Sequence, residues 1–134
     1  MKEEFIKKYN FIPKLYYPLY GYIELMLLKS CPIASINKKE SIHCGLCKLD
    51  QYYYQDRMGV NYPLISDENC ITKVLSDKPL DLLNKKEMIN KDFSSYLVFT
   101  LENELQTKNI LDNYFFDKDV EIDGFLGHFV SSPE

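Results

Sequence analysis

Four cysteines crowd into one polar stretch of the chain, and they constrain its fold more than any other feature. They are Cys31, Cys44, Cys47 and Cys70, and they lie within 40 consecutive residues of a 134-residue sequence. Residues 29–50 carry three of them among lysine, serine, asparagine and glycine, without the apolar period of a helix or strand. Because so polar a segment cannot be held by a hydrophobic core, we expect the thiols to organise it.

The spacing of the cysteines favours a bound metal. Cys44 and Cys47 form a Cys-x2-Cys pair, which can present two thiolates to one metal from a tight turn. Gly45, between them, gives the backbone the freedom that such a turn needs. With Cys31 and Cys70 the set becomes four thiolates, which suit either Zn²⁺ or a four-iron, four-sulfur cluster. The spacing does not separate these two cofactors.

Other uses of the cysteines are open. Free thiols buried as small apolar side chains are one alternative, and disulfides are another. The charged start of the chain at 1–4 lacks the apolar run of a signal peptide, and the longest apolar stretch, 16–28, is too short and interrupted to span a bilayer. We therefore expect a cytoplasmic protein, a setting that favours metal ligands or redox thiols over disulfides. His43 is a candidate substitute ligand.

Composition indicates one globular domain over residues 1–134, with a cysteine-rich insertion and a hairpin at 29–75. Hydrophobic residues make up 46% of the chain and charged residues 27%, a balance typical of folded proteins. The formal net charge is −4, and Arg57 is the single arginine. This charge argues against a nucleic-acid surface carried by bulk positive potential.

The apolar pattern predicts an α+β fold. The expected elements are a helix at 2–10, a buried strand at 20–28, a β-hairpin at 51–65, a strand at 70–75, a helical turn opened by Pro79 and a strand at 96–101. A helix follows, with Thr100 as its cap and an apolar face of Leu101, Leu105, Leu111 and Phe115. Pro63 suggests that the return strand of the hairpin is an edge strand.

Six motifs, taken in order, resemble the C-terminal part of the collagenase-like peptidase family U-thirty-two. They are YGYIELM at 20–26, the four cysteines with CP at 31–32, DRMG at 56–59 with YPL at 62–64, SDKPLDL at 76–82, FTLE at 99–102 and GHF at 127–129. The resemblance spans about residues 15–130. Single motifs are weakly specific, whereas six in the family's order are more so.

The resemblance implies a fold, a cofactor and a functional setting. Members of this family look like (β/α)-barrel proteins with a cysteine-rich insertion, so this chain would be a partial barrel-derived domain. Some members are described as collagenase-like peptidases, and others support hydroxylation of tRNA, ribosomal RNA or ubiquinone precursors. Several hold a four-iron, four-sulfur cluster, and by resemblance Cys31, Cys44, Cys47 and Cys70 would be its ligands here.

The chain also departs from the family in ways that bear on activity. A complete (β/α)₈ barrel needs roughly 200–250 residues, more than this chain has. We therefore expect a fragment or a small relative that keeps the cysteine module, with no independent catalysis and with catalytic residues unknown. A separate N-terminal barrel half, or a second copy of the chain, would cover the strand edges that a partial barrel exposes. An RNA partner is implied by the resemblance alone, and no membrane partner is expected.

Several other residues have both a functional and a structural interpretation. His128 could face a substrate, although a histidine between apolar neighbours is more often packed. Asp56 and Arg57 could contact a phosphate or simply stabilise a turn. The tyrosines at 52–54 could stack on bases or pack in a core. Glu102 suggests catalysis only by its family position, and its place at the start of a helix already suits a carboxylate.

Overall fold

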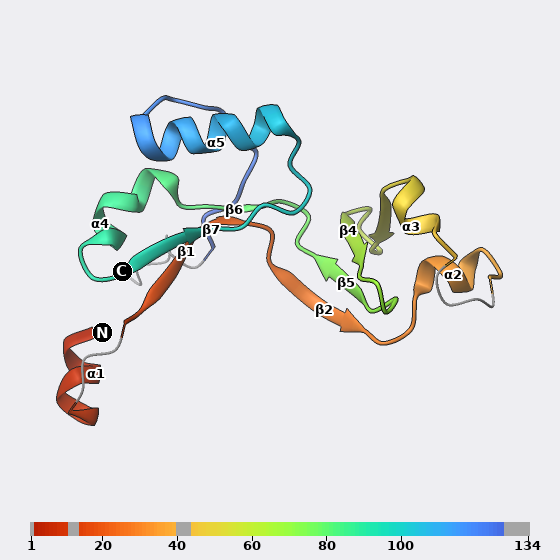
Figure 1. The fold of residues 1–134 in the computed structure, drawn as a ribbon, viewed down its shortest axis with the longest axis horizontal. Coiled ribbons are helices and arrows are strands. Elements are labelled where there is room, and N and C mark those ends of the chain that lie inside the picture. Colours follow the sequence, from red (N-terminus) through yellow and green to blue (C-terminus); the bar gives the residue numbers. More distant parts are fainter. Residues whose placement is uncertain (1, 11–13, 40–43, 128–134) are drawn as a thin grey trace. The chain divides into compact units, whose positions relative to one another are not determined.

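The computed structural model describes residues 2–10, 14–39 and 44–127, and it confirms the α+β class. These residues divide into two compact units (Figure 1). Unit 1 joins the chain up to Gly21 with the chain from Pro79 onward, and unit 2 is Tyr22–Lys78. The cysteine-rich segment 29–75 lies wholly within unit 2. Within the described residues no helix is both long and apolar enough to cross a membrane.

Unit 1 is built on a three-stranded sheet in the order β6-β1-β7. Its elements are α1 (Lys2–Tyr9), β1 (Tyr16–Gly21), β6 (Leu80–Asp81), the 3-10 helix η1 (Leu83–Lys85), α4 (Lys86–Asn90), β7 (Ser94–Leu97) and α5 (Glu104–Phe116). The central strand β1 pairs antiparallel with β6 and parallel with β7. The register with β7 shifts between Pro18 and Tyr20, next to a residue that has no N–H to donate to the ladder.

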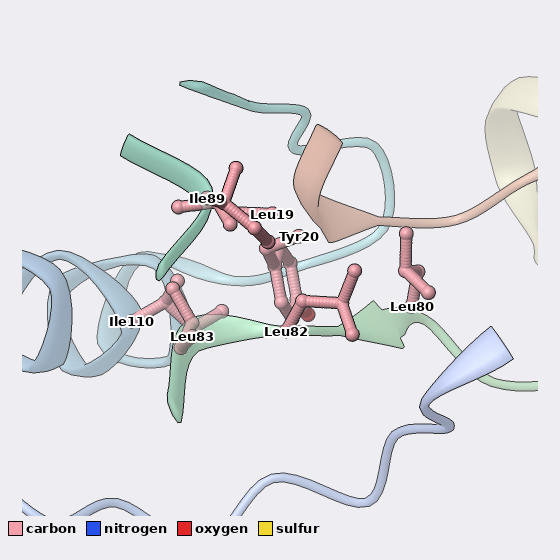
Figure 2. Close-up of a cluster of buried hydrophobic side chains, with 7 residues drawn as sticks. All are labelled: Leu19, Tyr20, Leu80, Leu82, Leu83, Ile89 and Ile110. Atoms are coloured by element: carbon pink, nitrogen blue, oxygen red, sulfur yellow. The ribbon is translucent and has the colours of Figure 1, made fainter. Parts of the chain in front are cut away.

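The core of unit 1 joins the sheet to its helices. Figure 2 shows the buried cluster, which comprises Leu19, Tyr20, Leu80, Leu82, Leu83, Ile89 and Ile110. Leu19 and Tyr20 come from β1, Ile89 from α4 and Ile110 from α5. The cluster also takes Leu80 from β6 and Leu83 from η1, so two strands and three helical elements, separated by up to about 90 positions in sequence, share one apolar core.

Gly21 ends β1 in a conformation that only glycine adopts easily. Its φ is +143°, and a Cβ placed there would lie 2.7 Å from the carbonyl oxygen of Val98 and 2.9 Å from that residue's Cβ. The Val98 N–H donates to the Tyr20 carbonyl at 2.9 Å, which draws the two segments together. Glycine is therefore required at this close approach.

Unit 2 contains a four-stranded antiparallel sheet in the order β2-β5-β4-β3. Its strands and helices are β2 (Glu24–Leu28), α2 (Pro32–Ile36), α3 (Leu46–Leu49), β3 (Tyr52–Gln55), β4 (Asn61–Ser66) and β5 (Thr72–Leu75). A small core of Ile33, Leu64 and Val74 joins α2 to the sheet. Cys31 and Cys47 pack against that core with their partly buried side chains.

The hairpin is confirmed, with one correction. β3 and β4 pair antiparallel, and Gln55 lies opposite Asn61, so that the connection is 56–60. The Asp56 carboxylate accepts hydrogen bonds from the N–H groups of Met58 at 2.8 Å and Val60 at 2.9 Å. The expectation that Pro63 marks an edge strand is wrong, because β4 is internal. Pro63 precedes the first residue of β4 that pairs with β5, so no ladder bond is required of it on that side.

The single buried strand expected at 20–28 is also wrong. The chain forms two strands, β1 and β2, which belong to different sheets. Leu25, Met26 and Leu27 are each more than half exposed, and because successive side chains of a strand alternate between faces, both faces of β2 are exposed there. The hydrophobic sequence predicted a strand here, but it did not show that the side chains of β1 would be buried and those of β2 exposed.

Residues after Pro79 do not form the expected helical turn. Leu80–Asp81 is the short strand β6, held between β1 and Phe125. The Phe125 N–H donates to the Pro79 carbonyl at 3.0 Å, and the Asp81 N–H donates to the Phe125 carbonyl at 2.9 Å. These long-range pairings favour an extended backbone over the local helical signal.

The last helix begins later than expected and buries a different face. The strand before it is β7, at Ser94–Leu97 and not 96–101, and the cap is Asn103 and not Thr100. Leu105 and Phe115, which were expected on the apolar face, are each 66% exposed, whereas Ile110 is buried. At the other end of α5, the Lys86 ammonium donates to the carbonyls of Asn113 and Tyr114 at 3.1 and 2.7 Å.

Removing the cap of α5 should weaken unit 1. The Asn103 side chain accepts from the Gln106 N–H and the Gln106 side chain accepts from the Asn103 N–H, both at 2.9 Å. We expect Asn103→Ala to lower the free energy of unfolding by about 1 kcal/mol, because the Gln106 N–H loses its side-chain acceptor at the start of the helix. Asn109→Ala, inside the same helix, is the matched control and should cost nothing, since alanine favours helix. Equal urea midpoints for the two variants would contradict this role.

Candidate cysteine site

All four cysteines line one cavity of unit 2. The cavity has a volume of about 330 Å³. Cysteine is the most frequent residue type among its lining residues. The lining residues are Cys31, Ile33, Cys44, Gly45, Cys47, Lys48, Ser66, Asp67, Glu68 and Cys70. Each cysteine is a free thiol of intermediate exposure, so none is paired in a disulfide and none is fully buried as an apolar residue.

Three different local structures bring the thiols to this cavity. Cys31 is the N-cap residue of α2, where Pro32 fixes the first helical position. Cys44 and Cys47 flank the start of α3, whose N-cap is Gly45 with φ of +77°. Cys70 lies in the turn between β4 and β5 and has a φ of +59°, which is uncommon for a residue with a side chain.

An aspartate holds the turn that carries Cys70. The Asp67 carboxylate accepts from the N–H groups of Asn69 at 2.8 Å and Ile71 at 2.9 Å. The Cys70 N–H donates to the Asp67 carbonyl at 3.1 Å. Asp67 therefore acts here as a turn residue that fixes the backbone of Cys70, although its position at the cavity edge first suggests a ligand.

The thiols share the cavity without meeting at one point. Among residues 2–10, 14–39 and 44–127 no three cysteine, histidine, aspartate or glutamate side chains are arranged closely enough to hold a metal ion. His43 lies outside the described residues, so its candidacy as a ligand stays a prediction. The structure thus brings the four sequence-predicted residues to one cavity but does not converge them on a single coordination centre.

Cys31 has the most developed surroundings of the four thiols. Burial raises the pKa of its thiol. Four polar groups together lower that pKa by more than burial raises it, so that it lies below its ordinary value: the backbone N–H groups of Ala34 and Ile33 and the hydroxyls of Thr72 and Ser66. The amide contacts lack the geometry of a capping hydrogen bond, so they act on the sulfur as electrostatic interactions. Sequence reasoning missed Ser66 and Thr72. Neither residue differs in the sequence from an ordinary strand residue, and the register of β4 and β5 is what places them opposite each other.

The other candidate residues in the described chain have structural partners. Asp56 holds its turn, and it accepts from the Tyr62 hydroxyl at 3.2 Å. Hydrogen bonds from the backbone, first from the Val60 N–H, lower the pKa of Asp56 more than desolvation raises it. Its neighbour Arg57 is exposed.

Glu102 and the tyrosines of β3 also have partners. The Glu102 carboxylate accepts from the Tyr20 hydroxyl at 2.9 Å and from the Thr100 N–H at 2.6 Å, which ties β1 to the segment before α5. Tyr52 packs against the core of unit 2, whereas Tyr53 and Tyr54 are more than half exposed. His128 lies outside the described residues.

Comparison with known proteins adds no assignment. No protein-family model, no curated protein and no solved structure matches this chain. The similarity to the family U-thirty-two therefore rests on the six motifs of the sequence, and the site must be interpreted from its own chemistry.

Proposed function

We propose that unit 2 is a cysteine-ligated module that holds an iron–sulfur cluster or a zinc ion through Cys31, Cys44, Cys47 and Cys70. The observation that supports this most is the shared cavity: four thiols spread over 40 residues, from three local structures, line one space. Apolar packing alone gives no reason for every cysteine of a chain to lie on one cavity. Soft thiolate donors are the ligands that zinc and iron–sulfur clusters take.

The arrangement favours a cluster over a zinc ion. A tetrahedral zinc site with bonds of about 2.3 Å draws its four sulfurs to within roughly 4 Å of one another. The cysteines instead surround a cavity of about 330 Å³, and no three of the described candidate ligands converge on a point. In a four-iron, four-sulfur cluster each iron takes one thiolate, so the cysteines stand further apart around a larger body. Electron transfer is the chemistry that a cluster with four thiolate ligands supplies.

We further propose that this module belongs to a protein of the family U-thirty-two type, in a system that hydroxylates a nucleic acid such as tRNA or a small molecule. Unit 1 would be the remnant of the C-terminal barrel strands. The parallel pairing of β1 with β7 supports this origin, whereas the antiparallel β6 is foreign to an all-parallel barrel. Both described sheets are open, so a separate barrel half or a second copy would be the partner at their edges.

A purely structural metal site is the second candidate, and one observation favours it. The helices α2 and α3 have five and four residues, and the core beneath them contains three buried side chains. Helices this short are not stable alone, so a bound metal would tie them to the β4–β5 turn. A fragment of a collagenase-like peptidase is the remaining alternative, and it rests on the family similarity alone.

Anaerobic purification of the whole chain, with an absorption spectrum and metal analysis, tests the proposal. We expect a brown protein with a broad band near roughly 400 nm and about four irons per chain, because thiolate-to-iron charge transfer absorbs there. A colourless protein with about one zinc would support the structural site instead. A chain that holds neither metal, both as purified and after reconstitution with iron and sulfide, would contradict both.

A further inference from the structure

Strand β2 presents an apolar free edge. Among the described residues it pairs with β5 alone, so it is the last strand of the sheet of unit 2 on that side (Figure 1). Leu25, Met26 and Leu27 are consecutive, and each is more than half exposed. Natural edge strands are usually protected by lysine, proline or a covering segment, and the strand Glu24–Leu28 contains neither of these residues. An edge of this kind is suited to pairing with another strand.

The backbone of β2 directs hydrogen-bonding groups toward this edge at Glu24. The Ser76 N–H donates to the Ile23 carbonyl at 2.8 Å, and the Ile23 N–H donates to the Ser76 hydroxyl at 3.0 Å. The backbone of Ile23 therefore faces the β5 side. Because the N–H and C=O groups of successive residues alternate in direction, those of Glu24 point away from β5.

Leu27 has the same orientation, because of the register of the sheet. The Asp67 N–H donates to the Ile71 carbonyl at 3.0 Å at the β4–β5 turn. Two residues further along β5, alternation directs the backbone of Lys73 toward β4 as well. Leu27 lies opposite Lys73, so its own N–H and C=O point away from β5. Glu24 and Leu27 are three residues apart, and a register shift between them supplies the extra residue.

We propose that β2 pairs antiparallel with β2 of a second copy of the chain, about a two-fold axis at Leu27. In this pairing Leu27 lies opposite the second copy's Leu27, and Glu24 lies opposite its Lys29, the residue that follows the strand. Lys29 is two residues from the axis and Glu24 is three, and the register shift in β2 absorbs this difference. The inference rests on the proposed function only for the premise that another chain covers an open sheet edge.

Charge complementarity favours a second copy over another partner. The segment 24–29 reads Glu-Leu-Met-Leu-Leu-Lys, with an acid at one end, a base at the other and apolar residues between. Its antiparallel copy therefore matches acid with base at both ends. Glu24 and Leu27 lie opposite Leu75 and Lys73, two residues apart on β5, so they project to one face. The Glu24 carboxylate bonds the Lys73 ammonium through Oε1, and its Oε2 would accept from Lys29 of the second copy.

The pairing covers apolar side chains on both faces of β2 and ends with two copies. Leu27 meets its counterpart on one face, and on the other face Met26 lies beside Leu28 of the second copy. Both copies use the same edge, so the contact is closed and does not extend into a fibre. A single strand edge gives an interface at the small end of the known range, so we expect a concentration-dependent dimer.

Sedimentation equilibrium of the whole chain tests the pairing. We expect the mass to rise from 15.8 kDa toward twice that value as the concentration approaches about 1 mM, a range that detects weak complexes. Leu27→Lys sets two ammonium groups against each other at the axis and should weaken the dimer by at least about 10-fold. Tyr53→Lys is the matched control, because it adds the same charge at an exposed side chain of β3, the opposite edge of the sheet. It should dimerise like the wild type.

Exchange of the two charges tests the register. Lys29→Glu sets acid opposite acid, and Glu24→Lys sets base opposite base, so each variant alone should dimerise about 10-fold more weakly than the wild type. In an equimolar mixture each acid again faces a base, and the two variants should bind each other more tightly than either binds itself. Both positions are exposed, so this experiment also decides the matter if Leu27→Lys does not fold.

The outcomes distinguish this inference from the proposed function. A wild-type chain that stays at 15.8 kDa over the whole range would overturn the self-pairing and leave the metal module standing. A dimer that Leu27→Lys leaves intact, or that Tyr53→Lys weakens equally, would also overturn it, because the interface would then lie elsewhere. Charge variants that show no preference for each other would contradict the register. A dimer of the expected behaviour without bound metal would support the pairing and contradict the metal module.

Discussion

Replacing Cys44 and Cys47 together by serine is expected to abolish metal binding. The two residues flank the αL turn at Gly45 and supply two of the four thiols on the cavity. Serine hydroxyls are poor ligands for zinc and for iron–sulfur clusters, so half of the donor set is lost while the side chains keep their size. We expect the affinity for Zn²⁺ to fall by more than about 100-fold, and the iron content after anaerobic reconstitution to fall to background.

The same substitution should loosen one part of unit 2 and spare another. The short helices α2 and α3 depend on the metal under our proposal, whereas β4 and β5 are held by their own ladder. We expect amide exchange to accelerate across residues 31–36 and 44–49 and to stay slow in β4 and β5. Ser76→Ala is the control for general destabilisation, because Ser76 is a buried serine of unit 2 that does not line the cysteine cavity. Full metal content in the double variant would show that these thiols are not ligands, and uniform exchange in both regions would show that the metal has no structural role.

Local side-chain chemistry explains the parts of the fold that could be predicted. Asp56 and Gly59 specify the β3–β4 turn through contacts within five residues, so the hairpin can be read from sequence. The start of α5 was readable too, because Asn103 and Gln106 form a capping box, but Thr100 offered a competing cap. The structure shows that reciprocal capping at Asn103 decides between them.

Long-range pairing explains the parts that could not be predicted. Leu80 and Asp81 are extended because they pair with β1 and with Phe125, more than 40 residues away. Side chains on both faces of β2 are exposed, although the apolar sequence of Leu25 to Leu28 favours a buried strand. Strand pairing and side-chain exposure both depend on contacts with residues far away in the sequence, which a local sequence pattern does not contain.

The candidate site was predictable in its ligands and not in its surroundings. The four cysteines could be named from composition and spacing. Ser66 and Thr72 become neighbours of Cys31 only through the register of β4 and β5 and the position of α2. Neither residue carries a signal in the sequence that distinguishes it from an ordinary strand residue, so the supporting contacts of a site require the structure.

Leu19→Ala is expected to have the largest effect on stability outside the cysteine site. Leu19 is fully buried, at 0% exposure, in the middle of the central strand of unit 1, and it belongs to the cluster of Figure 2 that joins β1 to α4 and α5. Truncation removes three buried carbon atoms and leaves a cavity that the surrounding strands and helices cannot fully close. We expect the free energy of unfolding to fall by about 3–5 kcal/mol, measured by urea denaturation with far-ultraviolet circular dichroism.

The matched control is Leu105→Ala on α5, where the same atoms are removed from a side chain that is 66% exposed. Since little apolar surface is buried there, its cost should stay within about 0.5 kcal/mol. The pair therefore tests where the core of unit 1 lies, because the sequence pattern placed Leu105 on the buried face and the structure places Ile110 there. A larger loss for Leu105→Ala than for Leu19→Ala would mean that α5 packs through its predicted face, and the cluster of Figure 2 would then not be the core.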